Sequence, residues 1–276
     1  MTGQAGEIGY DVADGVAVIE IAHGDLNTLT PEMHRRMHEV LIEFLGDPAV
    51  RCGVLTGRGL RAFCAGDDLR ATAPEPEEPV DAVLAELTPH HQRGGAEESW
   101  QWEYDVLQLA RHKPIVGAVT GWCLGGGFAY LMRLTDLRVA GESARFGLPE
   151  IRYGMAGMGG TLRLWRELPP LVANAMLLTG EPIDAREAHR VHLVNEVVAD
   201  EEAIPRARAL ARRIAEHPPL SVRLEMEALE QASEMSRAEA VRYGDRIYQL
   251  QRLALGESDL ESYESRRTRS HRAEGQ

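Results

Sequence analysis

Hydrophobic and polar positions in the N-terminal part of the chain switch between a strand-like and a helix-like pattern. Residues 16–21 and 50–56 are short runs rich in β-branched side chains, and both predict strands. Between them, Thr30-Pro31 has the form of a helix start, with Thr30 as N-cap and Pro31 in the first helical position. Apolar side chains then recur every four residues and predict a buried stripe on this helix: Met33, Met37, Leu41 and Leu45.

The same alternation continues further along the chain. Residues 100–112 predict a helix, residues 115–120 a strand, and residues 137–140 and 144–146 two short strands. A glycine-rich loop at 154–160 precedes a helix that begins at 161–167. Strands that alternate with helices indicate an α/β layered core with crossover connections.

Two regions depart from this alternation. In residues 71–98, Pro74, Pro76 and Pro79 lie among acidic side chains, which predicts a mobile surface insert. Beyond residue 200 the pattern is helical, over 201–216, then from a capping box at Ser236 and Glu239 to residue 255, and over 259–267. We therefore expect an α/β core over residues 1–200 and a helical region over 201–276 whose apolar faces serve an oligomer interface.

Composition narrows the class of protein. The chain has 276 residues, of which 44% are hydrophobic, enough for one core with a helical appendage. No run approaches the length of a membrane span, and residues 1–10 lack the pattern of a signal peptide, so we expect a soluble protein of the cytoplasm. Cys52, Cys64 and Cys123 lie in apolar surroundings without metal-like spacing, which favours buried thiols over disulfides.

Charge argues against a nucleic-acid partner. The net charge is -13, whereas binding to a phosphate backbone needs a basic face. A small anionic ligand stays possible, and arginine would have to meet any phosphate, because Lys113 is the only lysine.

The stretch at residues 121–130 is the first candidate for chemistry. Three consecutive glycines, Gly125 to Gly127, end a strand-like run and begin a helix-like one. They allow close approach of the backbone to a ligand, and the free N–H groups of a helix start suit an anion or oxyanion. A packing turn is the alternative. The spacing fits neither a Walker-type phosphate loop nor a dinucleotide fingerprint.

Glu150 is the second candidate. It follows a proline and has apolar neighbours, so burial would raise its pKa towards a value useful for proton transfer, although many such glutamates are ordinary loop residues. His34 and His38 have the spacing of two metal ligands on a helix, but no completing carboxylate follows them, and we expect no metal site. No Gly-x-Ser-x-Gly elbow appears.

Together, residues 62–69, 121–130 and 146–150 resemble the enoyl-CoA hydratase/isomerase family, also called the crotonase superfamily. The resemblance extends to the Asn27 region, to 154–161 and weakly to 259–267. It implies a spiral of ββα units with a helical C-terminal region that builds trimers, often paired into hexamers. It also implies an acyl-CoA substrate, whose coenzyme A is part of the substrate and not a bound cofactor.

Matching residue by residue, the resemblance implies that the backbone N–H groups of Asp67 and Gly126 hold the thioester oxygen. Such donors stabilise an enolate by about 2.7–4 kcal/mol each, and the Asp67 side chain would be incidental. The stretch 61–69 would hold coenzyme A, through residues Arg61, Ala62, Ala65 and Leu69. Tyr263, Arg266 and Arg267 match the family's C-terminal positions only loosely.

The resemblance also exposes a departure. Family hydratases use two glutamates, and the second matches Glu150. The first falls on Ala129 or Tyr130, because this helix carries one extra residue. One carboxylate can move a proton between two carbons, whereas addition of water needs one group to deprotonate the water and another to deliver the proton to C2. We therefore expect a 3-enoyl to 2-enoyl isomerase with Glu150 as its acid/base. Tyr130 is a candidate accessory group.

Two alternatives stay open at this stage. One is an acyl-CoA-binding protein of the same fold without catalysis, which the missing glutamate favours. The other is a different enolate reaction, such as decarboxylation, C–C hydrolysis or dehalogenation, to which Tyr153 or an acidic residue of the insert would contribute.

Overall fold

A computed structural model describes residues 6–71, 100–157, 164–232 and 234–254. The expected insert at 71–98 lies almost wholly outside these residues, as do the expected helix at 259–267 and the second half of the glycine-rich loop. Contacts between elements divide the chain into two compact units, Met1–Glu216 and His217–Gln276, which are described separately below.

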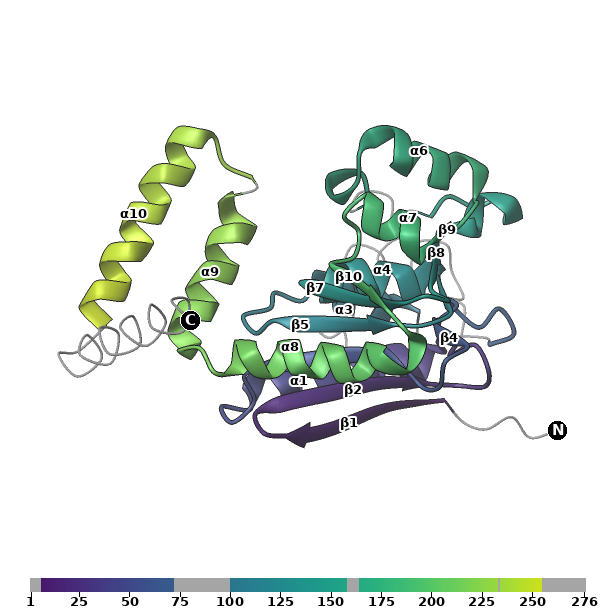
Figure 1. The fold of residues 1–276 in the computed structure, drawn as a ribbon, viewed down its shortest axis with the longest axis horizontal. Coiled ribbons are helices and arrows are strands. Elements are labelled where there is room, and N and C mark those ends of the chain that lie inside the picture. Colours follow the sequence, from purple (N-terminus) through teal and green to yellow (C-terminus); the bar gives the residue numbers. More distant parts are fainter. Residues whose placement is uncertain (1–5, 72–99, 158–163, 233, 255–276) are drawn as a thin grey trace, which may run out of the picture. The chain divides into compact units, whose positions relative to one another are not determined.

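The first unit contains a six-stranded sheet with the order β1-β2-β3-β5-β7-β10 (Figure 1). The β1 and β2 strands form an antiparallel hairpin, and each following pair is parallel. The hairpin turns at Asp14 and Gly15, both with positive φ, which is the turn that suits the right-handed twist of strands. The strands are β1 (Glu7–Ala13), β2 (Val16–Ala22), β3 (Cys52–Gly57), β5 (Ile115–Val119), β7 (Leu137–Gly141) and β10 (Glu196–Val198).

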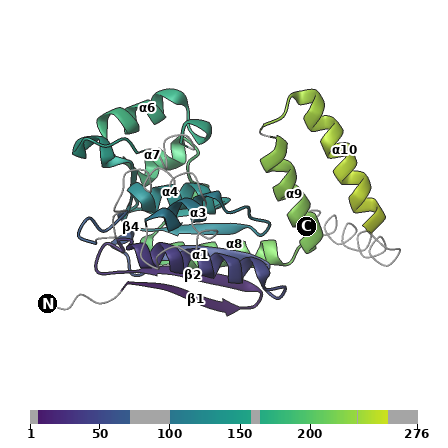
Figure 2. The ribbon, with the colours of Figure 1, turned by 180° about the vertical axis from the view of Figure 1, so that it is seen from behind.

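Helices cover both faces of this sheet. Helix α8 (Ala203–Ala215) lies on one face, where Ala207 and Ala211 pack against side chains such as Val54 and Val116. Helix α1 (Pro31–Gly46) lies behind the sheet in Figure 1 and in front of it in Figure 2. Its apolar side chains share the larger core with the opposite face of the strands. Strands covered on both faces are typical of parallel sheets.

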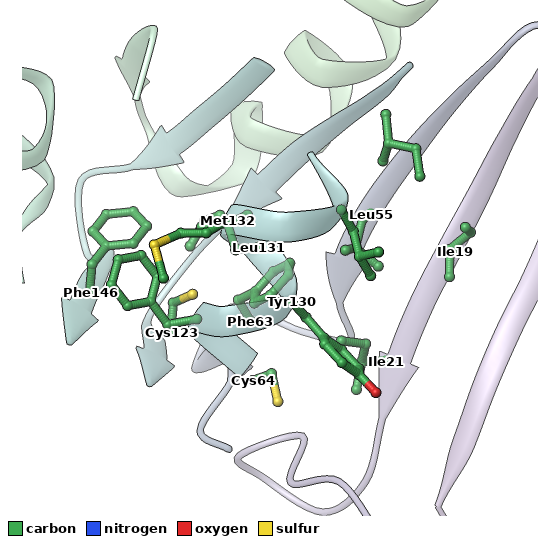
Figure 3. Packing of buried hydrophobic residues seen from close by; sticks show 14 of the residues in the cluster. Ile19, Ile21, Leu55, Phe63, Cys64, Cys123, Tyr130, Leu131, Met132 and Phe146 are labelled. Carbon is green, nitrogen blue, oxygen red and sulfur yellow. The ribbon is translucent and has the colours of Figure 1, made fainter. Parts of the chain in front are cut away.

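A smaller, four-stranded sheet carries the glycine stretch. Its order is β4-β6-β8-β9, with β4, β6 and β8 parallel. The strands are β4 (Ala62–Cys64), β6 (Trp122–Leu124), β8 (Arg145–Gly147) and β9 (Ile183–Asp184). Helix α4 (Gly125–Leu134) starts directly after β6. Figure 3 shows Tyr130 of α4 near Phe63 of β4, and Met132 of α4 near Phe146 of β8, all within one hydrophobic core. Packing in this core therefore fixes the position of α4 relative to β4, β6 and β8.

Shorter elements complete the first unit. They are α3 (Gln101–Gln108), the 3-10 helix η2 (Pro149–Tyr153), α6 (Pro170–Thr179), α7 (Ala185–Arg190) and the 3-10 helix η3 (Asp200–Glu202). The second unit has a hairpin of α9 (Pro219–Ala232) and α10 (Arg237–Ala254), in which no described residue is fully buried.

Most of the elements expected from the sequence are present. The Thr30 side chain accepts a hydrogen bond from Met33 N and caps α1, and the Ser236–Glu239 capping box forms at the start of α10. Helix α3 is shorter than expected, and Leu45 is only half-buried. The division between units falls after α8, not near residue 200, because α8 packs on the sheet.

Candidate active site

The N-terminus of α4 forms one wall of the site. Gly125 has a φ of +55°, which favours glycine, and turns the chain from β6 into the helix. Leu124, the residue before the helix, supplies no side-chain cap. The first N–H groups of a helix have no partner within the helix, so Gly126 N–H is available to an acceptor outside the protein.

The end of β4 forms the facing wall. Leu29 N–H donates to Gly66 O, and Asp68 N–H donates to Leu29 O. In an extended segment this leaves the N–H of Asp67 on the opposite side from Leu29. Gly126 lies close to this segment, since a methyl group built on Gly66 would be 3.4 Å from Gly126 N. The two expected oxyanion donors thus lie on adjacent segments.

Asn27 fixes the loop that carries Leu29. Its φ is +50°, a conformation that asparagine tolerates better than most residues. The buried side chain donates to Ala62 O at 2.7 Å and to Arg58 O at 3.0 Å, and accepts from His23 N–H. Asn27 therefore ties this loop to the first residue of β4 and to the residue that follows β3, in the region that the family resemblance includes.

Three carboxylates converge on Gly125 and Gly126. A methyl group on Gly126 would lie 2.9 Å from Asp67 Oδ1 and 3.3 Å from Glu103 Oε1, and one on Gly125 would lie 3.4 Å from Glu150 Oε1. The carboxylates come from the end of β4, from α3 and from η2. Glycine is needed at Gly126 because any side chain would displace them.

The convergence changes the acidity of two of these groups. Burial, with the negative charges of Asp67 and Glu150, raises the pKa of Glu103 to about 7 against an opposing effect of His34. Burial also raises the pKa of Glu150, with a further contribution from Asp67, while its own backbone N–H acts in the opposite direction. Carboxyl groups with raised pKa values are suited to exchange protons near neutral pH.

A buried chain of polar groups stands behind Asp67. His34 of α1 is fully buried, and its Nδ1 lies 2.5 Å from the Tyr130 hydroxyl. Burial raises the pKa of Tyr130 well above its usual value, so the hydroxyl keeps its proton and donates it to Nδ1. The ring proton of His34 is then on Nε2, which faces Asp67 Oδ1 at 3.2 Å without the alignment of a hydrogen bond.

Two sequence-based interpretations need correction. The Asp67 side chain is not incidental, because it faces both His34 and the helix glycines. Glu150 is not the only carboxylate here, because Glu103 reaches the same glycines from α3. Tyr130 is present but fully buried, with its hydroxyl held by His34, so it lies behind the site.

Glu103 was not predicted because it lies on α3, whereas the family resemblance places the second carboxylate on the helix that follows the glycines. The sequence of α3 nevertheless contains a signal for it. Trp100, Glu103 and Val106 are spaced by three and share one helix face. Val106 is buried and Trp100 packs edge-on against His34 at 5.7 Å, so the face that carries Glu103 points inward.

The expected coenzyme A segment lies along β4 and the turn after it. Arg61 is exposed and pairs with Asp25 at 2.6 Å, whereas Ala62 is buried in the strand. Ala65 is half-buried and donates its N–H to Leu26 O, and Leu69 is 78% exposed. Tyr153, at the end of η2, is 68% exposed. Residues 263–267 lie outside the described residues.

Other candidates from the sequence have structural roles. The three cysteines are free and buried, as predicted, and burial raises the pKa of Cys52 and Cys64 to about 12. His38 contacts Trp102 with ring centroids 5.3 Å apart. Within the described ranges, no three His, Cys, Asp or Glu side chains gather as metal ligands. None of the helices described here is long and apolar enough to cross a bilayer.

The fold and the site define an α/β protein in which a strand end and a helix N-terminus present backbone donors beside carboxylates. The family model described as enoyl-CoA hydratase/isomerase matches residues 11–254. The chain belongs to this family of enzymes and has its crotonase-like fold.

Relatives and solved structures agree with this assignment. The chain is 32% identical to (E)-benzylidenesuccinyl-CoA hydratase of Thauera aromatica, over 86% of this chain and 88% of that protein. It is 37% identical to carnitinyl-CoA dehydratase of Proteus mirabilis, over 76% and 75% respectively. Enoyl-CoA hydratase subunit I of Geobacillus kaustophilus superposes with a TM-score of 0.80 at 31% identity, with 95% of each chain covered.

Proposed function

We propose that this enzyme acts on an acyl-CoA thioester by moving a proton at C2 through an enolate. In this proposal, the N–H groups of Asp67 and Gly126 hold the thioester oxygen and Glu150 is the acid/base at C2. Coenzyme A enters as part of the substrate, along the segment 61–69, and not as a resident cofactor.

The position of Glu150 carries the proposal. Its Oε1 lies beside Gly125, one residue from the donor at Gly126, and its Oε2 would lie 3.1 Å from a methyl group on Gly157. Oε2 is buried and has no hydrogen-bond partner among the described residues. An unpartnered buried oxygen with a raised pKa beside two backbone donors is suited to accept a proton from an acidified carbon.

Two reactions share this enolate. The sequence favours isomerisation between 3-enoyl and 2-enoyl thioesters, for which Glu150 alone is sufficient. Hydration and dehydration, the reactions named in the two relatives, also need a group that deprotonates the attacking water or protonates the leaving hydroxyl. Isomerisation and dehydration begin with removal of the C2 proton, and hydration ends with the reverse of that step, so proton transfer at C2 is the activity to measure first.

The test is deuterium exchange at C2. Parent protein and Glu150→Gln are incubated in D2O with saturated and 3-enoyl acyl-CoA thioesters, and incorporation is followed by mass spectrometry. We expect loss of at least about 100-fold in exchange by the variant, because general acid/base groups contribute 10²–10⁴. Equal exchange by the two proteins would refute the role of Glu150. Binding of acyl-CoA by the parent without any exchange would favour the non-catalytic alternative.

We also propose that copies of the chain associate, as trimers or as hexamers built from two trimers. The α9–α10 hairpin supports this, because none of its described residues is buried and Leu229 and Leu253 are 72% and 84% exposed. Apolar surface of this kind favours association. Sedimentation equilibrium tests it, and a stable monomer at micromolar concentration would contradict it.

A further inference from the structure

Glu103 is the feature of the site that the proposed function does not use. It lies in the first turn of α3, a helix that precedes the glycine stretch in sequence and packs against α1 and α4. Its Oε1 is 3.3 Å from the point where a Cβ of Gly126 would be, so the carboxyl group is beside the oxyanion donor. Glu150 approaches the same turn of backbone at Gly125, from η2.

The two glutamates therefore flank the donors from two different elements. One is anchored through α3 and the other through the segment after β8, and neither is on α4, where Ala129 and Tyr130 are buried in the core. An acyl group whose thioester oxygen accepts a hydrogen bond from Gly126 N–H would therefore have two carboxyl groups nearby, Glu150 beside Gly125 and Glu103 beside Gly126. This is the arrangement that a reaction with two proton transfers needs.

Asp67 explains why Glu103 holds a proton. Both carboxyl groups face the same point beside Gly126, and two negative charges so close are unfavourable. The Nε2–H of His34 faces Asp67 Oδ1 and favours the negative charge there. Burial and the nearby charge of Asp67 raise the pKa of Glu103 to about 7, so Glu103 can hold and donate a proton near neutral pH. The groups that face Glu103 are Asp67, His34 and Glu150.

We propose that Glu103 is the second catalytic carboxyl group, acting on the oxygen at C3, and that the enzyme adds water to 2-enoyl-CoA thioesters or removes it from 3-hydroxyacyl-CoA thioesters. This inference rests on the proposed enolate chemistry and adds to it the reaction class. Glu103 then supplies, from α3, the function of the carboxylate that is absent from α4.

The steps balance in the direction of dehydration. Glu150 takes the C2 proton, and the electron pair of that bond forms the enolate, whose charge is held by the two N–H groups. The enolate re-forms the thioester carbonyl, the C2–C3 double bond forms and the C3–O bond breaks. The leaving hydroxyl takes the proton of Glu103 and departs as water. Exchange with solvent returns the proton from Glu150 and reprotonates Glu103, and hydration follows the same steps in reverse.

The experiment separates the two carboxyl groups by two readouts. Parent, Glu103→Gln and Glu150→Gln are assayed for hydration of a series of 2-enoyl-CoA thioesters, for dehydration of 3-hydroxyacyl-CoA thioesters, and for C2 deuterium exchange with saturated thioesters. Glu142→Gln removes an exposed carboxylate outside the site and is the matched control. Thermal unfolding and calorimetric binding of a saturated acyl-CoA confirm that each variant is folded and binds.

We expect Glu103→Gln to lose hydration and dehydration by at least about 100-fold and to keep exchange at C2. Glu150→Gln loses all three, and Glu142→Gln loses none. Hydration by folded Glu103→Gln within about threefold of the parent overturns the inference. So does a parent that exchanges or isomerises at C2 but hydrates no thioester, and in that case the proposed enolate chemistry stands. A parent that exchanges nothing at C2 refutes the proposed function and this inference with it.

Discussion

Replacing Glu103 with glutamine tests the electrostatics of the site without any substrate. Its folded-state pKa of about 7 is above the usual value of 4.5 for a glutamate, so ionisation of this group opposes folding. Below about pH 4.5 the group is neutral in both states and has no such effect. Between pH 4.5 and 7 the unfolded chain ionises this group while the folded protein keeps the proton, so stability falls until the group is ionised in both states.

The magnitude follows from the shift. At about 1.4 kcal/mol per pKa unit, the rise from 4.5 to about 7 corresponds to about 3.5 kcal/mol as an upper bound. The side chain is only half-buried, so solvent screening reduces this to about 1–2 kcal/mol. Glutamine resembles the protonated glutamate in shape and charge. Glu103→Gln should therefore match the parent at pH 4 and exceed its melting temperature by about 2–8 °C at pH 8.5.

The assay is thermal unfolding followed by circular dichroism at both pH values, with Glu142→Gln as control. Effects of pH on the other groups cancel in the difference between each variant and the parent. The exposed Glu142 should give the same difference at both pH values. A Glu103→Gln difference that does not change with pH would refute the argument that Glu103 is protonated at neutral pH.

Three further substitutions test the framework of the site. Gly126→Ala places a methyl group 2.9 Å from Asp67 Oδ1 and should lower turnover at least about tenfold. Gly244→Ala, which has no neighbouring atom within 4 Å, is the control and should not lower it. Equal kinetics of Gly126→Ala and the parent would contradict the close approach. Tyr130→Phe leaves Nδ1 of His34 without its donor and should lower the free energy of unfolding by about 1–3 kcal/mol in urea titrations, and an unchanged midpoint would count against the contact. Asn27→Ala removes three side-chain hydrogen bonds at a residue with positive φ and should cost about 2–4 kcal/mol in the same titration. A loss below about 0.5 kcal/mol would contradict this role of Asn27.

The sequence by itself determined the elements whose information is local. Thr30-Pro31 and the Ser236–Glu239 box mark helix starts because capping depends on residues three or four apart. The three glycines mark the strand-to-helix turn, since only a residue without a Cβ fits beside other backbone and side chains there. The motifs of residues 62–69, 121–130 and 146–150 were sufficient to recognise the family.

The tertiary structure decided which distant side chains share the site. The first strand was not predicted, because residues 7–13 depend on pairing with β2 for their conformation. Glu103 appeared as an ordinary residue of a helix, and Asp67 as a backbone donor only. Their meeting beside Gly126 depends on how α3 packs on α1 and α4 and on where β4 ends. Convergence of groups from separate elements is a property of packing, and no local pattern in the chain encodes it.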